Sequence, residues 1–164
     1  MTATLLLPQL AAAEEREQDV GVDRLVRAGI NRMHRMQTTS GAFAYWPGSK
    51  NEHVYGTGRA ALILAQAEAL GYPLPESMKE KLVAWLRTEV LGRRQPDANM
   101  RALLAHAASM WEIPAEGANV LLFEWKDKLS TTGKMHLLAA LINLGQLEWA
   151  NQLFDELDVE AIVA

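Results

Sequence analysis

The stretch Arg-Ala-Ala-Leu-Ile-Leu-Ala-Gln-Ala-Glu-Ala-Leu at residues 59–70 is apolar almost all round. It stops at Gly71, a residue type favoured just beyond a helix C-terminus, and Pro73 follows shortly afterwards. A helix with apolar residues on nearly every side has to be covered on every side by other parts of the protein. The stretch therefore predicts an inner helix of an all-α domain.

The segment that follows is amphipathic. Pro75 stands where the first turn of a helix tolerates proline, and apolar residues then recur at helical spacing from Met78 to Val90, just before Gly92. Such a helix can bury one face and leave the other in water. Residues 59–90 therefore predict a helical hairpin with one inner and one outer helix.

The same alternation of inner and outer helices returns twice. An inner helix predicted over 99–111 precedes an outer helix predicted over 119–129. A third inner helix is predicted over 134–144, and apolar residues stripe a last outer helix that reaches residue 157. The inner helices start roughly 35 to 40 residues apart, a period typical of stacked helical repeats.

Two all-α architectures satisfy this pattern. A solenoid of the tetratricopeptide type also stacks hairpins, but both helices of each pair must then keep a stacking face. An α/α toroid places inner helices within a ring of outer helices, which accounts better for inner helices that are the more apolar. We therefore expect one helical domain over residues 1–164, built from stacked hairpins as an α/α toroid or a partial toroid.

Composition and charge exclude several classes of protein. The formal net charge is −4 and there is no cysteine, so we expect no nucleic-acid face, no disulfide framework and no thiol nucleophile. Arginines at 24, 27, 32 and 35 fall on a helix predicted over 22–36 and are expected to face solvent. The apolar start is too short for a membrane span, and no signal peptide is visible.

Residues 37–48, Gln-Thr-Thr-Ser-Gly-Ala-Phe-Ala-Tyr-Trp-Pro-Gly, connect that helix to the first inner helix, and we call them the aromatic link. Loops normally lie in water and carry polar residues. Phe43, Tyr45 and Trp46 must therefore be either buried by neighbouring helices or presented to a partner. We expect the three aromatics to anchor the junction between the helices.

The aromatic link resembles a family signature. Gln37 followed by Gly41 and Phe43 is similar to the pattern at hairpin junctions of terpene cyclases, protein prenyltransferases and the thioester domains of complement and alpha-2-macroglobulin proteins. The bacterial alpha-2-macroglobulin type is more similar, because it carries Met-Gln and then Gly-Gly-Phe-Ala-Tyr-Trp-Pro-Gly. The resemblance runs from about residue 30 onward and departs from that string at Ala42. The link residues that it singles out are Gln37, Gly41, Phe43, Tyr45, Trp46, Pro47 and Gly48.

The resemblance implies a helical toroid within a periplasmic, secreted or cell-surface protease inhibitor. In that family a thioester between a cysteine and a glutamine bonds covalently to the attacking protease. The thioester requires Cys-x-Glu-Gln, and this chain has no cysteine. Leu-Leu-Leu-Pro at residues 5–8 resembles the Leu-Leu-Pro that follows the motif, so we expect either a fragment that begins just past the motif or a relative that never formed the bond.

The role implied for such a chain is structural and non-covalent. It would dock on other domains of a larger parent protein or on target proteases, and a homodimer would cover apolar surface that a partial toroid leaves open. The alternative is a free-standing helical-repeat module whose concave face binds a peptide or another protein. The carboxylate pairs Glu14-Glu15 and Asp155-Glu156 lack a pocket partner, which leaves glycosidase chemistry unsupported.

His53 is the single catalytic candidate in the sequence. In complement-like thioester domains a histidine a little beyond this link helps to transfer the acyl group, and packing or helix capping is the alternative role. The histidines at 34, 53, 106 and 136 lack the spacing of zinc ligands, so we expect no metal, no other cofactor and no enzymatic activity. His106 and His136 fall in inner helices, where a hydrogen-bonded core or lumen histidine is the simpler interpretation.

Overall fold

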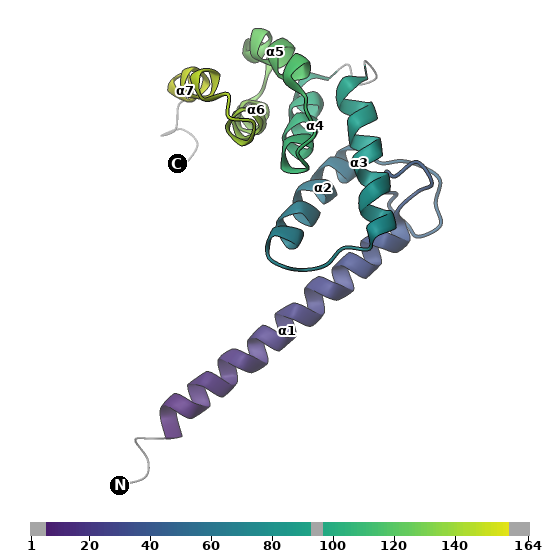
Figure 1. Ribbon diagram of the computed structural model, residues 1–164, viewed down its shortest axis with the longest axis vertical. Helices are drawn as coiled ribbons and strands as arrows, with labels where there is room; N and C mark the ends of the chain where they lie inside the picture. Colours follow the sequence, from purple (N-terminus) through teal and green to yellow (C-terminus); the bar gives the residue numbers. More distant parts are fainter. Residues whose placement is uncertain (1–5, 93–96, 158–164) are drawn as a thin grey trace.

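The computed structural model describes residues 6–92 and 97–157, which are almost entirely helices and the turns between them (Figure 1). The elements are α1 (Leu6–Met36), α2 (Val54–Ala69), α3 (Glu76–Leu91), α4 (Ala98–Met110), α5 (Glu116–Glu124), the 3-10 helix η1 (Lys126–Lys128), α6 (Thr131–Asn143) and α7 (Leu147–Asp155). Within these residues the only strand-like pairing is an isolated bridge between Gln37 and Phe43. The prediction of an all-α fold is confirmed.

The predicted inner helices are present as α2, α4 and α6, with bounds that differ by a few residues from the expected ones. α1 begins at Leu6, well before the predicted start at residue 22. Pro8 lies in its first turn, where proline does not interrupt a helix. The outer helix expected over 119–129 is wrong in its bounds. α5 ends at Glu124, where the chain tightens into η1 and brings Leu129 into the core with 6% of its surface exposed.

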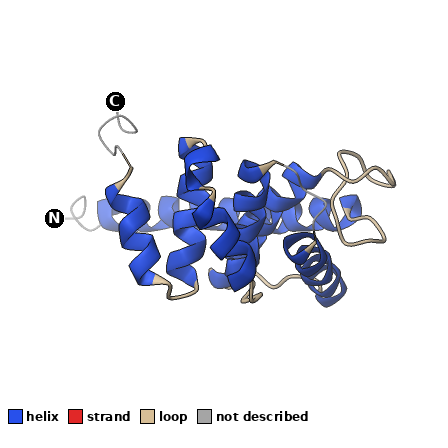
Figure 2. Ribbon diagram, turned by 90° about the horizontal axis from the view of Figure 1, so that it is seen from above, coloured by secondary structure: helices blue, strands red, loops and turns tan. Residues whose placement is uncertain are grey.

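The central helix of the molecule is α4. It packs against α2 and α6 and also contacts α3 and α5, while α7 packs on α6. Figures 1 and 2 show the later helices side by side in a row, and Figure 1 shows α1 extending away from that row. The described residues thus form stacked hairpins, and the closure of this row into a toroid stays a prediction.

The hydrophobic interior consists of two clusters that share α4. The first core takes Leu103, Leu104 and further residues of α4 together with residues of α2, α3 and the aromatic link. The second core takes Ala102 and Ala105 of α4 together with residues of α5, α6 and α7. Small residues on this face of α4 let α6 approach closely, and helices with small contact residues pack at the shorter interaxial distances.

The apolar stripe predicted along α1 is buried only near the end of the helix. Ile30 is buried against the first core and Met33 is partly buried, whereas Val22 and Leu25 expose 54% and 69% of their surfaces. The four arginines of this segment are exposed, as expected, and Arg27 pairs with Asp23 at 2.8 Å. Residue 5 and the side chains before residue 21, which include the predicted Glu14-Glu15 pair, lie outside the described part of the chain.

Candidate functional site

The first half of the aromatic link is a tight, hydrogen-bonded turn. The amide of Ala44 donates to the carbonyl of Met36 at 3.0 Å, and the amide of Thr38 donates to the carbonyl of Ala42 at 2.8 Å. These bonds return the chain to the end of α1 after only a few residues. Ala42 and Phe43 are consequently enclosed, with 0% and 5% of their surfaces exposed.

Gln37 and Gly41 fix this turn to α3. The amide nitrogen of the Gln37 side chain donates to the carbonyl of Gly41 at 3.1 Å and to the carbonyl of Met78 at 2.9 Å. Gly41 has a φ of +102°, and a Cβ at this position would lie 2.1 Å from the carbonyl oxygen of Lys81. Only glycine combines this backbone conformation with such a close approach to α3.

Phe43 joins the link to α2. Its side chain enters the first core, and its amide donates to the hydroxyl oxygen of Thr57 at 2.8 Å. The same hydroxyl donates to the carbonyl of His53 at 2.9 Å, so Thr57 connects the middle of the link to the residue that precedes α2. Sequence reasoning missed Thr57, although a lone threonine in the first turns of an otherwise apolar helix is the available signal. Gln37, Gly41 and Phe43 thus hold the ends of three helices together.

The second half of the link faces the solvent. Tyr45 and Trp46 expose 64% and 71% of their surfaces, and Pro47 and Gly48 are exposed as well. The prediction that Tyr45 and Trp46 anchor the helix junction by burial is therefore wrong for this chain. The chain turns after these residues, where the amide of Ser49 donates to the carbonyl of Trp46 at 3.1 Å and Gly48 has a φ of +79°. Of the three aromatic side chains, only Phe43 anchors the junction by burial.

His53 caps α2. Its Nδ1 accepts a hydrogen bond from the amide of Gly56 at 2.9 Å, which satisfies one of the free N–H groups at the start of the helix. Because Nδ1 accepts, the proton of the neutral ring lies on Nε2. The ring of Tyr45 lies against His53 with the centroids 4.1 Å apart. The structure therefore shows the capping role, and acyl transfer by His53 stays a prediction.

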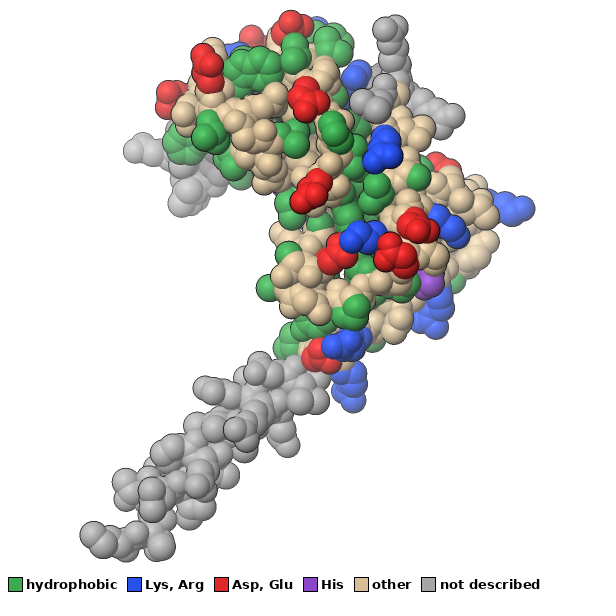
Figure 3. All heavy atoms as spheres, in the orientation of Figure 1, with side chains coloured by type: hydrophobic (Ala, Val, Ile, Leu, Met, Phe, Trp, Pro, Cys, Tyr) green, Lys and Arg blue, Asp and Glu red, His purple; other side chains and the backbone are tan. Residues whose placement is uncertain are grey.

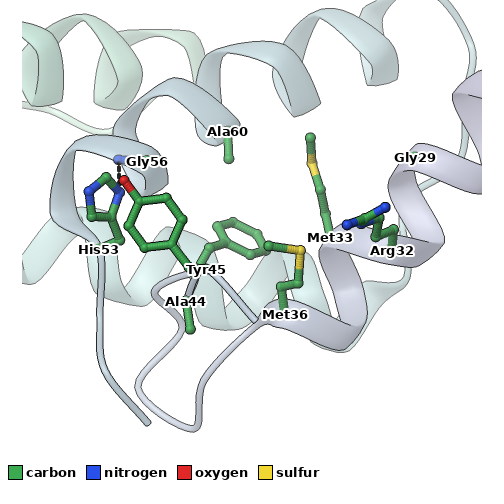
Figure 4. Close-up of a pocket in the computed structure, with 10 residues that line it drawn as sticks. Gly29, Arg32, Met33, Met36, Ala44, Tyr45, His53, Gly56 and Ala60 are labelled. Atoms are coloured by element: carbon green, nitrogen blue, oxygen red, sulfur yellow. Dashed lines mark hydrogen bonds between the residues drawn. The ribbon is translucent and has the colours of Figure 1, made fainter. Parts of the chain in front are cut away.

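A hollow of about 350 Å³ lies between the end of α1, the link and the start of α2, and we call it the link cavity. Figure 4 shows Tyr45 and His53 at one side of it and Met33, Met36 and Arg32 at the other. Its lining is almost wholly apolar, and Arg32 supplies the one side chain with a permanent charge. The space can receive an apolar group.

Basic side chains surround this part of the molecule. Figure 3 shows Lys and Arg side chains along the described end of α1 and beside the link. Acidic residues lie among them, and Lys79 pairs with Glu68 at 2.5 Å. Mixed charge of this kind is an ordinary solvated surface and gives no continuous basic stripe. Within residues 6–92 and 97–157, no helix is long and apolar enough to cross a membrane, and no group of acidic and histidine residues could hold a metal ion.

His106 and His136 meet between α4 and α6. Their Nδ1 atoms are 3.0 Å apart, so one ring donates a hydrogen bond to the other. Burial, together with the neighbouring His136 and Arg59, lowers the pKa of His106 to about 4. Burial and Arg59 also lower the pKa of His136. Both histidines are thus partly buried and hydrogen-bonded to each other, as expected, and His136 also lines a cleft.

Comparison of the chain with protein-family models, with curated proteins and with solved structures finds no match. The resemblance to bacterial alpha-2-macroglobulin proteins therefore rests on the sequence alone, chiefly on the link residues. The geometry gives those residues a definite structural task, which is to join α1, α2 and α3.

Proposed function

We propose that this chain is a helical docking domain of a larger protein and that it belongs to a protease inhibitor of the bacterial alpha-2-macroglobulin type. Its place would be the periplasm, the cell surface or the medium. One observation carries the proposal: Tyr45 and Trp46 are presented outward beside an apolar cavity, although both are large aromatics.

The division of work within the aromatic link supports this proposal. Gln37, Gly41 and Phe43 are fully used in holding the helices together, whereas Tyr45 and Trp46 contribute little buried surface. Exposed tyrosine and tryptophan are among the residue types that carry most of the binding energy in protein interfaces. Trp46 directly follows Tyr45, which lines the link cavity, so a partner that covers both aromatics would also contact the cavity.

The exposed part of α1 offers further apolar side chains to a partner. Val22 and Leu25 are apolar, more than half exposed, and belong to a helix of which only the last turns pack on the domain. Isolated exposed apolar residues are common on proteins, but two on one helix, together with two exposed aromatics in the link that follows it, offer a partner several apolar contacts. In a multidomain protein this surface would lie against a neighbouring domain.

The chemistry of the proposed role is non-covalent. A thioester needs a cysteine, and the chain has none, so a covalent bond to a protease cannot form from these residues. The contribution of the domain would be to position its neighbours and to hold a protease by surface contact. His53 would serve this role indirectly, by fixing the start of α2 and the ring of Tyr45.

A free-standing helical-repeat module is the second candidate. The row of hairpins around α4 favours it, because stacked hairpins without ring closure are the usual architecture of repeat proteins that bind peptides. The two candidates differ in where the partner of the aromatic link resides: on the same polypeptide in the first case, on a separate protein in the second.

A photoreactive amino acid at position 46 of the natural gene product separates the two. We expect a cross-link from position 46 to another domain of the same polypeptide, identified by mass spectrometry after proteolysis. The control places the same amino acid at position 151, where the exposed Asn151 of α7 lies on another helix. A cross-link to a separate protein alone would support the repeat module, and an unreacted position 46 would contradict docking through the link.

A further inference from the structure

A second hollow lies where the three described inner helices begin. It has a volume of about 260 Å³ and is lined by residues at the starts of α2, α4 and α6, and we call it the inner-helix cleft. It shares no lining residue with the link cavity. The proposed docking surface does not use it, so its purpose has to be sought in its own side chains.

The cleft contains a cation without an acidic partner. Arg59 is exposed on α2 and lines the cleft, and in the described part of the chain no carboxylate lies within ion-pair distance of it. Asp97 lines the same cleft, but its Oδ1 accepts a hydrogen bond from the amide of Met100 at 2.7 Å and thereby caps α4. The guanidinium of Arg59 is therefore free to bind an anion with two parallel hydrogen bonds.

His136 adds a hydrogen-bonding group on the α6 side of the cleft. Its Nδ1 is engaged with His106, so Nε2 is the ring nitrogen that remains for a ligand. When His106 donates to His136, the neutral ring of His136 carries its proton on Nε2 and acts as a donor. With this tautomer Arg59 and His136 supply two donors from different helices, and Arg59 is near enough to influence the pKa of His136.

The remaining walls of the cleft are mixed. Asn99, Ser130 and Thr132 are polar, and Asn99 and Ser130 hydrogen-bond to each other, whereas Tyr55, Met100 and Leu103 supply apolar surface. Tyr55 is 54% exposed and lies one helical turn before Arg59, and Met100 and Leu103 line the cleft from α4. The volume falls below the range of about 300 to 1,000 Å³ that is usual for sites that enclose a whole drug-sized ligand. The cleft fits a single residue with an apolar side chain and an acidic group.

We propose that the inner-helix cleft binds an apolar carboxylate, with the carboxylate held by Arg59 and His136 and the apolar side chain against Tyr55 and Leu103. A free acid and the C-terminal residue of a peptide share this chemistry. Asp97 also lines the cleft, and the carboxylate oxygen that does not cap α4 would accept the N–H of an acylated residue. The negative charge of Asp97 repels the ligand carboxylate, which therefore lies on the Arg59 side of the cleft.

Two small probes test the proposal on the whole chain. N-acetyl-leucine carries the carboxylate, and N-acetyl-leucinamide has the same shape without the charge. We expect N-acetyl-leucine to shift the ring resonances of His136 and His106 in NMR spectra at neutral pH, with a dissociation constant on the order of 1 mM. The amide should bind at least ten times more weakly, because it loses the paired contact with Arg59.

Variants identify the groups responsible. Arg59→Gln should lower the affinity for N-acetyl-leucine at least tenfold. Arg87→Gln, which removes an exposed arginine of α3, should leave this affinity unchanged. Both side chains are exposed, so both variants should fold. Binding should also raise the pKa of His136, which makes the affinity for N-acetyl-leucine increase as the pH falls from about 7.5 to 5.5.

Acyl-leucine peptides with a free or an amidated C-terminus then distinguish the two sources of the carboxylate. Tighter binding of the free-acid peptide than of N-acetyl-leucine would assign the cleft to a chain terminus, and equal binding would assign it to a small acid. Equal affinity for the acid and the amide probe, or unchanged binding by Arg59→Gln, would overturn the proposal. Neither result bears on docking through the aromatic link, which lies elsewhere.

Discussion

Gly41 and Gly48 lie in the same link, both have a positive φ, and only one of them touches another helix. Gly41 has a φ of +102°, and a Cβ there would lie 2.1 Å from the carbonyl oxygen of Lys81 and 3.1 Å from the Cβ of Trp85. Gly48 has a φ of +79°, and a Cβ there would meet nothing within 4 Å. Gly41→Ala therefore tests the close approach to α3, and Gly48→Ala is its matched control.

The two substitutions should differ in free energy by the steric contribution alone. A left-handed conformation costs an alanine about 1 to 2 kcal/mol, and the reduced freedom of the unfolded chain offsets about 0.4 to 1 kcal/mol of this. Gly41→Ala must in addition displace the backbone of α3, and overpacking of this kind costs about 1 to 3 kcal/mol. We therefore expect a loss of roughly 1 kcal/mol for Gly48→Ala and roughly 2 to 4 kcal/mol for Gly41→Ala.

Urea denaturation followed by far-ultraviolet circular dichroism measures both losses. In thermal unfolding, we expect Gly41→Ala to lower Tm by about 5 to 15 °C and Gly48→Ala to lower it by a few degrees. Equal losses for the two variants would refute the reasoning, because they would show that α3 does not lie against the link at Gly41.

Three further changes have expected outcomes of their own. Phe43→Ala should lower the free energy of unfolding by about 3 to 5 kcal/mol, whereas Trp46→Ala should change it by less than about 0.5 kcal/mol, as urea titrations would show. Thr57→Val should cost about 1 to 3 kcal/mol in the same assay, since it leaves the buried amide of Phe43 without an acceptor. The pKa of His106 is lowered to about 4, so between pH 6.5 and 4 the unfolded chain binds a proton that the folded chain does not, and stability should fall as the pH falls. Urea midpoints measured across that range should decline less in His106→Asn, and an equal decline in both proteins would contradict a role for this histidine.

The helices could largely be predicted from the sequence, because their signals are local. The run at 59–70 needed only its composition and Gly71 to mark an inner helix, and the structure places that run within α2 and its cap. Gly71 adopts a φ of +88° just beyond the helix, as a terminating glycine does. The start of α1 was not predicted, because the apolar stripe that marked the helix begins at Val22, whereas the helix begins at Leu6.

The exposure of side chains could not be predicted in the same way. Phe43 and Trp46 are three residues apart in one aromatic string, yet one is buried and the other is 71% exposed. The difference arises from α2 and α3, which enclose the first half of the link and end short of the second. The contact between His106 and His136 likewise depends on the relative axial position of α4 and α6, which no local pattern encodes.

The sharing of α4 between the two cores has a consequence for cooperativity. Leu103 and Leu104 belong to the first core and Ala102 and Ala105 to the second, so neither core can lose its packing without releasing the helix that completes the other. Stacked hairpins that meet only at shared edges can unfold one after another. Here the hairpins on both sides of α4 should instead melt in one transition. The packing around α4 in the middle of the chain, rather than at either end, should set the temperature of that transition.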